Sequence, residues 1–421
     1  MKKIQKIDWT KSNILFIKEN RSDEVGKGKQ DELRPIIEPW LTALFQSEHL
    51  SLLLGTGITT AITKIANPAF TCRGMQRIDF SLYNDEIKKQ AEISAKQYNR
   101  GNANFEDDLR ISMELLKGLE ILENSNANNL KLEINNKLST LISEILKNEK
   151  AILSDDEKSE EALLYLKKFL ISFASRSATR DRVNIFTTNY DRLIEYALDD
   201  AGIYVLDRFQ GTINPIFRLN RIELDYHYNP PGIRGEPRYV EGVARFTKLH
   251  GSLDWKMIKN EIIREPLPFG KELTPGEILD PFSSKVIFPN SAKGIETAYF
   301  PYSELFKDLS SAICKPNSVL VTYGYGFGDS HINSIIKNML NVPSTHLVII
   351  SFDDASGRIK DFIENENSAQ YTLLIGEYLG GFENLIDYYL PKPAIDRISD
   401  RLAELYEKRG IIDSKGLKKH V

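Results

Sequence analysis

The chain has 421 residues, of which 41% are hydrophobic and 27% charged, a composition typical of a globular protein with a sizeable core. Its formal net charge is -4, so no domain-wide positive field favours nucleic acid as a sequence-specific partner. The two cysteines, Cys72 and Cys314, exclude a disulfide framework and a four-cysteine zinc site.

The two ends of the chain differ in composition from the middle. We interpret the polar and charged residues 1–38 as a solvated N-terminal arm, residues 39–390 as the main domain, and residues 391–421 as a helix with a basic tail. The first residues lack the apolar run of a secretory signal, and no apolar stretch approaches the ~20 residues of a membrane span. We therefore expect a soluble, cytoplasmic protein without a membrane partner.

Apolar runs predict the strands of one sheet. Residues 50–54 are apolar except for Ser51 and show no alternation, as in a strand buried on both faces. Further strands are predicted at residues 183–187, 246–249, 285–288, 318–322, 346–352 and 371–375. Because these strands alternate with helices, they predict an α/β fold with a Rossmann-like, mainly parallel sheet.

Two long segments interrupt this alternation. Residues from about 85 to 175 carry apolar side chains at helical spacing with charged faces, which predicts a large helical insertion. We expect this insertion to cover a core and to contribute no chemistry. Residues 208–242 are long and irregular, which is typical of a lid or binding loop.

Two glycine-containing loops follow predicted strands. In open α/β sheets, ligands bind beyond the carboxyl ends of the strands. Gly55, Thr56 and Gly57 form the first loop, which either brings backbone close to a phosphate or is a tight turn. The second loop, from Gly324 through Tyr325 and Gly326 to Phe327, can present N–H groups to a ribose or phosphate, or is a glycine-rich turn.

Two further strand ends carry polar side chains. TTNYD, residues 187–191, places Thr188, Asn189 and Asp191 where a strand gives way to a helix. Capping of that helix by Asn189 or Asp191 explains part of this pattern. The segment LHG ends another strand with His250, whose side chain has both proton states accessible near neutral pH.

In this order, GTG, TTNYD, KLHGSLDW and GYGFGDSHI resemble the sirtuin-like domain of bacterial antiviral NADases. TTNYD is similar to the sirtuin T-Q-N-x-D signature, LHG to the segment with the sirtuin catalytic histidine, and GTG to the phosphate-binding G-A-G. The resemblance implies a sirtuin-type fold. The four-cysteine zinc module of sirtuin deacetylases is not matched, so hydrolysis of NAD is favoured over protein deacetylation and no zinc is expected.

The resemblance also implies roles for the residues of these motifs. Asn189 would hold the nicotinamide ribose and orient the attacking water, and His250 would be the general base or would polarise the ribose. The implied NAD-binding residues are Gly55, Thr56 and Gly57 at the pyrophosphate, Thr188 and Asp191, and Gly324, Tyr325, Gly326 and Phe327 at the adenosine ribose.

The implied function is depletion of cellular NAD in anti-phage, abortive-infection defence in the bacterial cytoplasm. The resemblance points to a homo-oligomer with a separate HerA-like ATPase/helicase or, alternatively, a short Argonaute. Three alternatives stay open: a catalytically inactive module that senses NAD or ADP-ribose, an NAD-dependent dehydrogenase that uses Asp79, and a structural subunit of an assembly.

Overall fold

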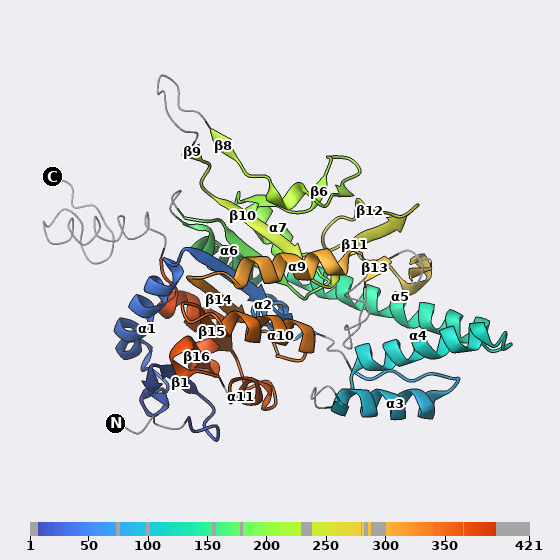
Figure 1. The fold of residues 1–421 in the computed structure, drawn as a ribbon, viewed down its shortest axis with the longest axis horizontal. Coiled ribbons are helices and arrows are strands. Elements are labelled where there is room, and N and C mark those ends of the chain that lie inside the picture. Colours follow the sequence, from blue (N-terminus) through green and yellow to red (C-terminus); the bar gives the residue numbers. More distant parts are fainter. Residues whose placement is uncertain are drawn as a thin grey trace, which may run out of the picture.

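The computed structural model shows a central sheet with helices on both faces (Figure 1). It describes residues 7–72, 76–97, 102–153, 157–176, 180–228, 238–278, 280–281, 285–287, 300–364 and 366–392. The predicted helix and basic tail at 391–421 lie almost entirely outside the described residues. None of the described helices is long and apolar enough to cross a membrane.

The central sheet is mainly parallel. Within the described residues it has nine strands in the order β2-β1-β16-β15-β14-β3-β4-β10-β5. Their bounds are Ile14–Ile17 (β1), Glu19–Asn20 (β2), His49–Leu54 (β3), Val183–Thr187 (β4), Tyr204–Leu206 (β5), Val243–Lys248 (β10), Ser318–Tyr323 (β14), His346–Ser351 (β15) and Tyr371–Ile375 (β16). All neighbours from β16 to β5 pair in parallel, whereas β1 pairs antiparallel with β16. The predicted Rossmann-like α/β class is confirmed.

Helices bury both faces of this sheet, which explains why its strands are apolar without alternation. On one face, Leu52 and Leu54 of β3 pack in a core with helices α1, α2, α6 and α7. On the other face, Leu53 packs in a core with α9, α10 and α11. The helix bounds are Gln30–Phe45 (α1), Thr56–Ala66 (α2), Glu157–Ala174 (α6), Leu193–Asp200 (α7), Tyr302–Ile313 (α9), Ser330–Leu340 (α10) and Arg358–Ile363 (α11). Three short helical segments complete the first face: Glu377–Gly380 (α12), Phe382–Asn384 (α13) and the π-helix Leu385–Tyr389 (η6).

The predicted helical insertion is present between β3 and β4. It comprises Asn84–Gln97 (α3), Phe105–Ile121 (α4), Ala127–Ile152 (α5) and α6. Helices α3 and α4 extend away from the sheet (Figure 1), and with part of α5 they enclose a core of their own around Leu109, Leu116 and Ile134. Helix α6 instead packs against α2 in the main core. The insertion is therefore attached to the domain along its C-terminal half.

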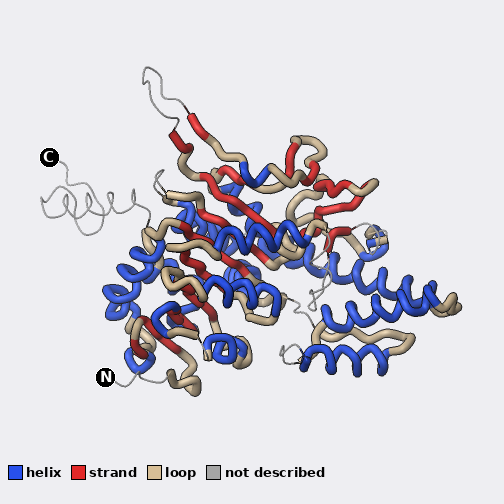
Figure 2. The backbone as a smooth tube through the Cα atoms, in the orientation of Figure 1, coloured by secondary structure: helices blue, strands red, loops and turns tan. Residues whose placement is uncertain are grey.

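A second, antiparallel sheet lies at the far edge of the domain (Figure 2). Its order is β13-β11-β12-β7-β6, with β11 at Gly251–Ile258, β12 at Glu261–Arg264, β13 at Lys285–Ile287, β6 at Phe209–Gln210 and β7 at Ile216–Phe217. Residues 285–287 of the strand predicted at 285–288 lie here and not in the parallel sheet, and residue 288 lies outside the described residues. The segment 208–242 also holds Arg221–Glu223 (η2) and the pair His227–Tyr228 (β8) and Arg238–Tyr239 (β9), so its described part is not structureless.

The expected solvated arm at residues 1–38 is corrected by the structure. All four residues of Ile14–Ile17 are buried, and this strand pairs with β16 as part of the sheet. Helix α1 begins at Gln30 and buries Leu33 and Ile37 in the main core. The sequence interpretation missed this strand because Ile14–Ile17 is a short apolar run within a segment whose average composition is polar and charged.

The register of four parallel strands brings their carboxyl ends together. Leu54 of β3 lies beside Tyr323 of β14 and beside Thr187 of β4, and Thr187 lies beside Lys248 of β10. The loops that begin at Gly55, Thr188, Leu249 and Gly324 therefore start at one edge. Such an edge, where connections leave a central strand in both directions, is where α/β proteins bind ligands.

Two of these loops meet through their backbones. Gly57 N donates to Gly324 O at 3.1 Å, and Gly55 N donates to Tyr323 O at 3.1 Å. A Cβ atom on Gly57 would lie 2.6 Å from Gly324 Cα, closer than side-chain carbons approach backbone. Gly324 also has φ +60°, a conformation that glycine adopts without strain. Both glycines are thus required by this contact.

We expect Gly57→Ala to lower the free energy of unfolding by about 1–3 kcal/mol, because the added methyl group forces the two loops apart. Gly118→Ala in α4 is the matched control. Apart from the adjoining backbone of its own helix, no atom lies within 4 Å of the position that its added methyl group would take, so removing a helical glycine should stabilise by up to about 1 kcal/mol. Urea unfolding measures both. Equal effects of the two substitutions would contradict the close-packing argument.

Candidate functional site

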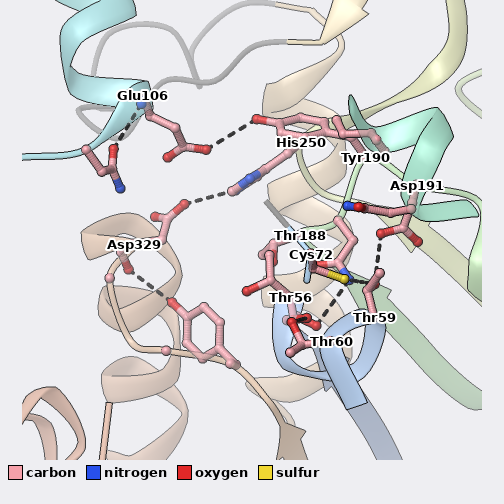
Figure 3. Close-up of a pocket in the computed structure, with 18 of the residues that line it drawn as sticks. Thr56, Thr59, Thr60, Cys72, Glu106, Thr188, Tyr190, Asp191, His250 and Asp329 are labelled. Carbon is pink, nitrogen blue, oxygen red and sulfur yellow. Dashed lines mark hydrogen bonds and ion pairs between the residues drawn. The ribbon is translucent and has the colours of Figure 1, made fainter. Parts of the chain in front are cut away.

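A cavity of about 440 Å³ opens at the carboxyl edge of the parallel strands (Figure 3). This volume lies in the range of small-molecule and cofactor sites. Its lining from the strand-end loops is Gly55, Thr56, Thr59, Thr60, Thr188, Asn189, Tyr190, Asp191, His250, Tyr325, Gly326, Gly328 and Asp329. The remaining lining residues are Cys72, Asn102, Asn104, Glu106, Leu141, Ile145, Asn148 and Arg358.

Asn189 is buried in the floor of this cavity and is held by a directed hydrogen-bond chain. The Thr59 hydroxyl donates to Asp191 Oδ2 at 2.8 Å, so a lone pair of Thr59 Oγ1 faces Asn189. Asn189 Nδ2 donates to this oxygen at 3.0 Å and to Gly55 O at 3.1 Å. Thr59 Oγ1 and Gly55 O both act as hydrogen-bond acceptors here. The amide nitrogen of Asn189 must therefore face them, and Oδ1 must point in another direction.

The buried Oδ1 of Asn189 accepts no hydrogen bond from any described residue. Buried polar atoms without partners are rare, and they cost about 1–3 kcal/mol when they stay unsatisfied. Asn189 lines the cavity, so its amide is fixed in orientation beside any molecule that enters.

Asp191 serves both the site and the following helix. Its Oδ1 accepts the N–H of Leu193, the first residue of α7, at 3.2 Å, while Oδ2 takes the Thr59 hydroxyl. Helix capping thus explains one oxygen of Asp191 but not the position of Asn189. Helix capping and a role in the site therefore both apply to Asp191: Oδ1 caps the helix, and Oδ2 orients Thr59.

His250 lies on the opposite side of the cavity from the threonines of α2 (Figure 3). Its Nε2 is 3.0 Å from Asp329 Oδ2. The other oxygen of Asp329 accepts the N–H groups of His331 and Ile332 and caps α10. The helix N-terminus holds the carboxylate, and the carboxylate in turn orients the imidazole, an arrangement used to position catalytic histidines.

The helical insertion contributes a wall of the same cavity. Glu106, in the first turn of α4, accepts a hydrogen bond from the Tyr190 hydroxyl at 3.4 Å. Burial, together with Glu106, raises the pKa of Tyr190 well above its usual value, so the hydroxyl stays protonated and donates. Figure 3 shows Glu106, Tyr190, His250 and Asp329 gathered at one end of the cavity. The expectation that the insertion takes no part in the site does not match this geometry.

A buried ion pair attaches the insertion to the site loop. Glu149 of α5 accepts from Arg192 N at 2.8 Å and from Nη2 at 2.5 Å, and both side chains are almost fully buried. Burial raises the pKa of Glu149, and the hydrogen bonds from Arg192 oppose that rise. On the other side of the loop, the buried Lys248 ammonium donates to Tyr190 O at 3.3 Å and to Glu195 Oε1 at 2.9 Å. The backbone around Asn189 is therefore held from two directions.

Most predicted site residues come together here. Gly55, Thr56, Thr188, Asn189, Asp191, His250, Tyr325 and Gly326 line the cavity. Gly57 and Gly324 lie behind it in the backbone contact described above. Phe327 is absent from the lining; it is buried against Tyr325 and Phe362 with ring centroids 4.8 and 4.7 Å away. These three residues support the site without facing it.

Sequence reasoning missed Thr59, Glu106, Asp329 and Arg358. Asp329 was visible as a helix cap, but its pairing with His250 joins residues 79 positions apart. Glu106 and Arg358 begin helices outside the recognised motifs, and no local pattern marks them as ligand-facing. Asp79, the alternative dehydrogenase acid, is exposed, pairs with Lys88 and follows no described strand.

In the described part of the chain, no group of three or more His, Cys, Asp or Glu side chains is arranged to hold a metal ion. Cys72 and Cys314 form no disulfide. Cys72 lines the cavity, and burial raises its thiol pKa.

Comparison with protein-family models matches residues 183–371 to the SIR2-like domain. This segment is similar to the SIR2-like domain. It covers slightly less than half of the chain and includes Asn189, His250, Asp329 and Arg358, whereas the Gly55–Gly57 turn and the insertion precede it. A comparison with curated proteins gives no significant match. The family match supports a sirtuin-type function that involves NAD.

We expect Glu149→Gln to lower the free energy of unfolding by about 3 kcal/mol, because it leaves the Arg192 charge buried without its counter-ion. Glu38→Gln, which breaks the more exposed pair with Arg34 in α1, should cost under about 1 kcal/mol. Chemical unfolding of both variants tests the difference. A loss as small for Glu149→Gln as for Glu38→Gln would mean that the ion pair does not hold the insertion against the site loop.

Proposed function

We propose that the protein hydrolyses NAD at the bond between nicotinamide and ribose, releasing nicotinamide and ADP-ribose. The observation that carries this proposal is the buried, unpartnered Oδ1 of Asn189 in the same cavity as the His250–Asp329 pair. The SIR2-like match supports NAD as the ligand. Protein deacetylation is not part of the proposal.

The reaction requires little acid catalysis. As the C–N bond breaks, its electron pair neutralises the cationic nicotinamide nitrogen, and positive charge develops on the ribose as in glycoside hydrolysis. The carboxylates of Glu106 and Asp329 line the cavity and favour such a cation electrostatically. The leaving group therefore needs no proton from the protein.

Water completes the reaction at the ribose carbon. Asn189 Oδ1 accepts a hydrogen bond from a ribose hydroxyl or from the attacking water and so fixes its orientation. As the new C–O bond forms, His250 accepts the proton that the water loses, and Asp329 holds the ring in place during this transfer. The proton then passes to solvent, and ADP-ribose leaves.

The biological role is proposed from the resemblance of the motifs. Consumption of NAD would arrest an infected bacterial cell, which fits abortive-infection defence against phage. Such an activity must be restrained in the absence of infection, so we propose a homo-oligomer controlled by a separate HerA-like ATPase or, as the alternative, by a short Argonaute.

We expect Asn189→Ala to reduce nicotinamide release by at least about 100-fold, because an oriented polar contact in the transition state is lost. His250→Ala should reduce it by about 100-fold or more through loss of the general base. Asn341→Ala, at the exposed end of α10, is the control and should leave turnover unchanged. Chromatography of NAD incubated with each purified protein, with and without the ATPase, measures the products.

The outcomes separate the candidate functions. Normal turnover by Asn189→Ala with an unchanged melting curve would rule out the assigned role of Asn189. Binding of NAD by the wild type without nicotinamide release in either condition would favour the NAD- or ADP-ribose-sensing module. Absence of both binding and turnover would favour a structural subunit.

A further inference from the structure

The lining of the cavity contains a single arginine or lysine, Arg358, within the part of the chain that the structure describes. The lining carboxylates are Glu106, Asp191 and Asp329. Asp191 and Asp329 each use both oxygens in hydrogen bonds within the protein. For an anionic ligand that enters this cavity, Arg358 is the lining side chain that can supply a positive charge.

The Arg358 side chain is held by a backbone carbonyl of the glycine-rich turn and not by a carboxylate. Its Nε donates to Gly326 O at 2.6 Å. None of the described carboxylates forms an ion pair with it, whereas buried arginines such as Arg192 and Arg208 each have one. The Nε contact fixes the side chain while both Nη groups make no hydrogen bond to described residues. A half-buried guanidinium arranged in this way is prepared for a ligand that offers paired oxygens.

The glycine-rich turn brings this cation close to a helix N-terminus. A Cβ on Gly326 would lie 3.2 Å from Arg358 Nη2, so the guanidinium covers that glycine. Two residues earlier, Gly324 contacts Gly57 in the first turn of α2. Helix α2 has eleven residues, and Gly55 and Thr56 at its start line the same cavity. The positive end of the helix dipole and the guanidinium thus act on neighbouring parts of one cavity.

We propose that Arg358 binds the diphosphate of the substrate and makes the site selective for dinucleotides and ADP-ribose over nicotinamide riboside. The inference rests on the proposed function. A diphosphate diester carries two negative charges and offers paired oxygens, which match the two Nη groups and the start of α2. Nicotinamide riboside has no phosphate and gains nothing from Arg358. The carboxylates of Glu106 and Asp329, which line the same cavity, would then act on the ribose and nicotinamide part of the substrate.

Direct binding of ADP-ribose, measured by calorimetry on the full chain, tests this assignment without requiring catalysis. Loss of charge-assisted hydrogen bonds predicts that Arg358→Gln weakens ADP-ribose binding about 10- to 100-fold. Arg358→Lys, which keeps the charge but not the fork of donors, should recover part of the affinity. Lys360→Gln removes an exposed charge from the same helix and should bind like the wild type.

Kinetics supply the second readout. In Arg358→Gln, the KM for NAD should rise about 10- to 100-fold, whereas nicotinamide release from nicotinamide riboside should be unchanged. A melting curve like that of the wild type excludes unfolding as the cause.

The inference and the proposed function fail in different ways. Wild-type affinity of Arg358→Gln for ADP-ribose, or no binding of ADP-ribose by the wild type, would overturn the role of Arg358. Weakened ADP-ribose binding in Arg358→Gln, combined with no nicotinamide release by the wild type, would keep Arg358 as a diphosphate ligand and reject the hydrolysis.

Discussion

The close approach of two backbones at the carboxyl edge of the sheet is the constraint on which the site depends. Gly57 and Gly324 come so near that neither position accommodates a side chain. This contact sets the position of the start of α2 and that of the turn carrying Tyr325 and Gly326. Because both loops leave strands paired in fixed register, the spacing between Asn189 and the glycine turns follows from the sheet and not from loop flexibility.

The helical insertion is part of the site as well as part of the scaffold. Its α4 supplies Glu106 at the cavity, and its α5 supplies Glu149 beneath the loop that carries Asn189. The two contacts lie on different helices and act on two nearby residues of that loop, Tyr190 and Arg192. A displacement of the insertion would therefore alter the backbone of Asn189 directly. This mechanical link would give the proposed regulatory subunit a physical route to the site.

Continuous local patterns could be predicted from the sequence, and long-range pairings could not. The apolar run at Leu50–Leu54 and the motif around Asn189 were recognisable because strand and polar loop are adjacent in the chain. The strand Ile14–Ile17 was missed because charged residues surround a four-residue run. The strand Gly251–Ile258 was missed because it mixes glycine, charge and apolar residues, as antiparallel edge sheets permit. The orientation of the Asn189 amide depends on Thr59, 130 residues away.

The distribution of charge in the cavity connects these features with the proposed cleavage of NAD. The diphosphate and the nicotinamide ribose of NAD need opposite electrostatic surroundings: the first is dianionic, and the second becomes cationic as its glycosidic bond breaks. A uniformly basic cavity would bind the phosphates and oppose the reaction, whereas a uniformly acidic one would exclude the substrate. Here Arg358 donates to the glycine turn beside α2, whereas Asp329 contacts His250 and Glu106 contacts Tyr190. The cavity therefore holds both signs of charge, supplied from the starts of three different helices, as the proposed binding and bond cleavage would require.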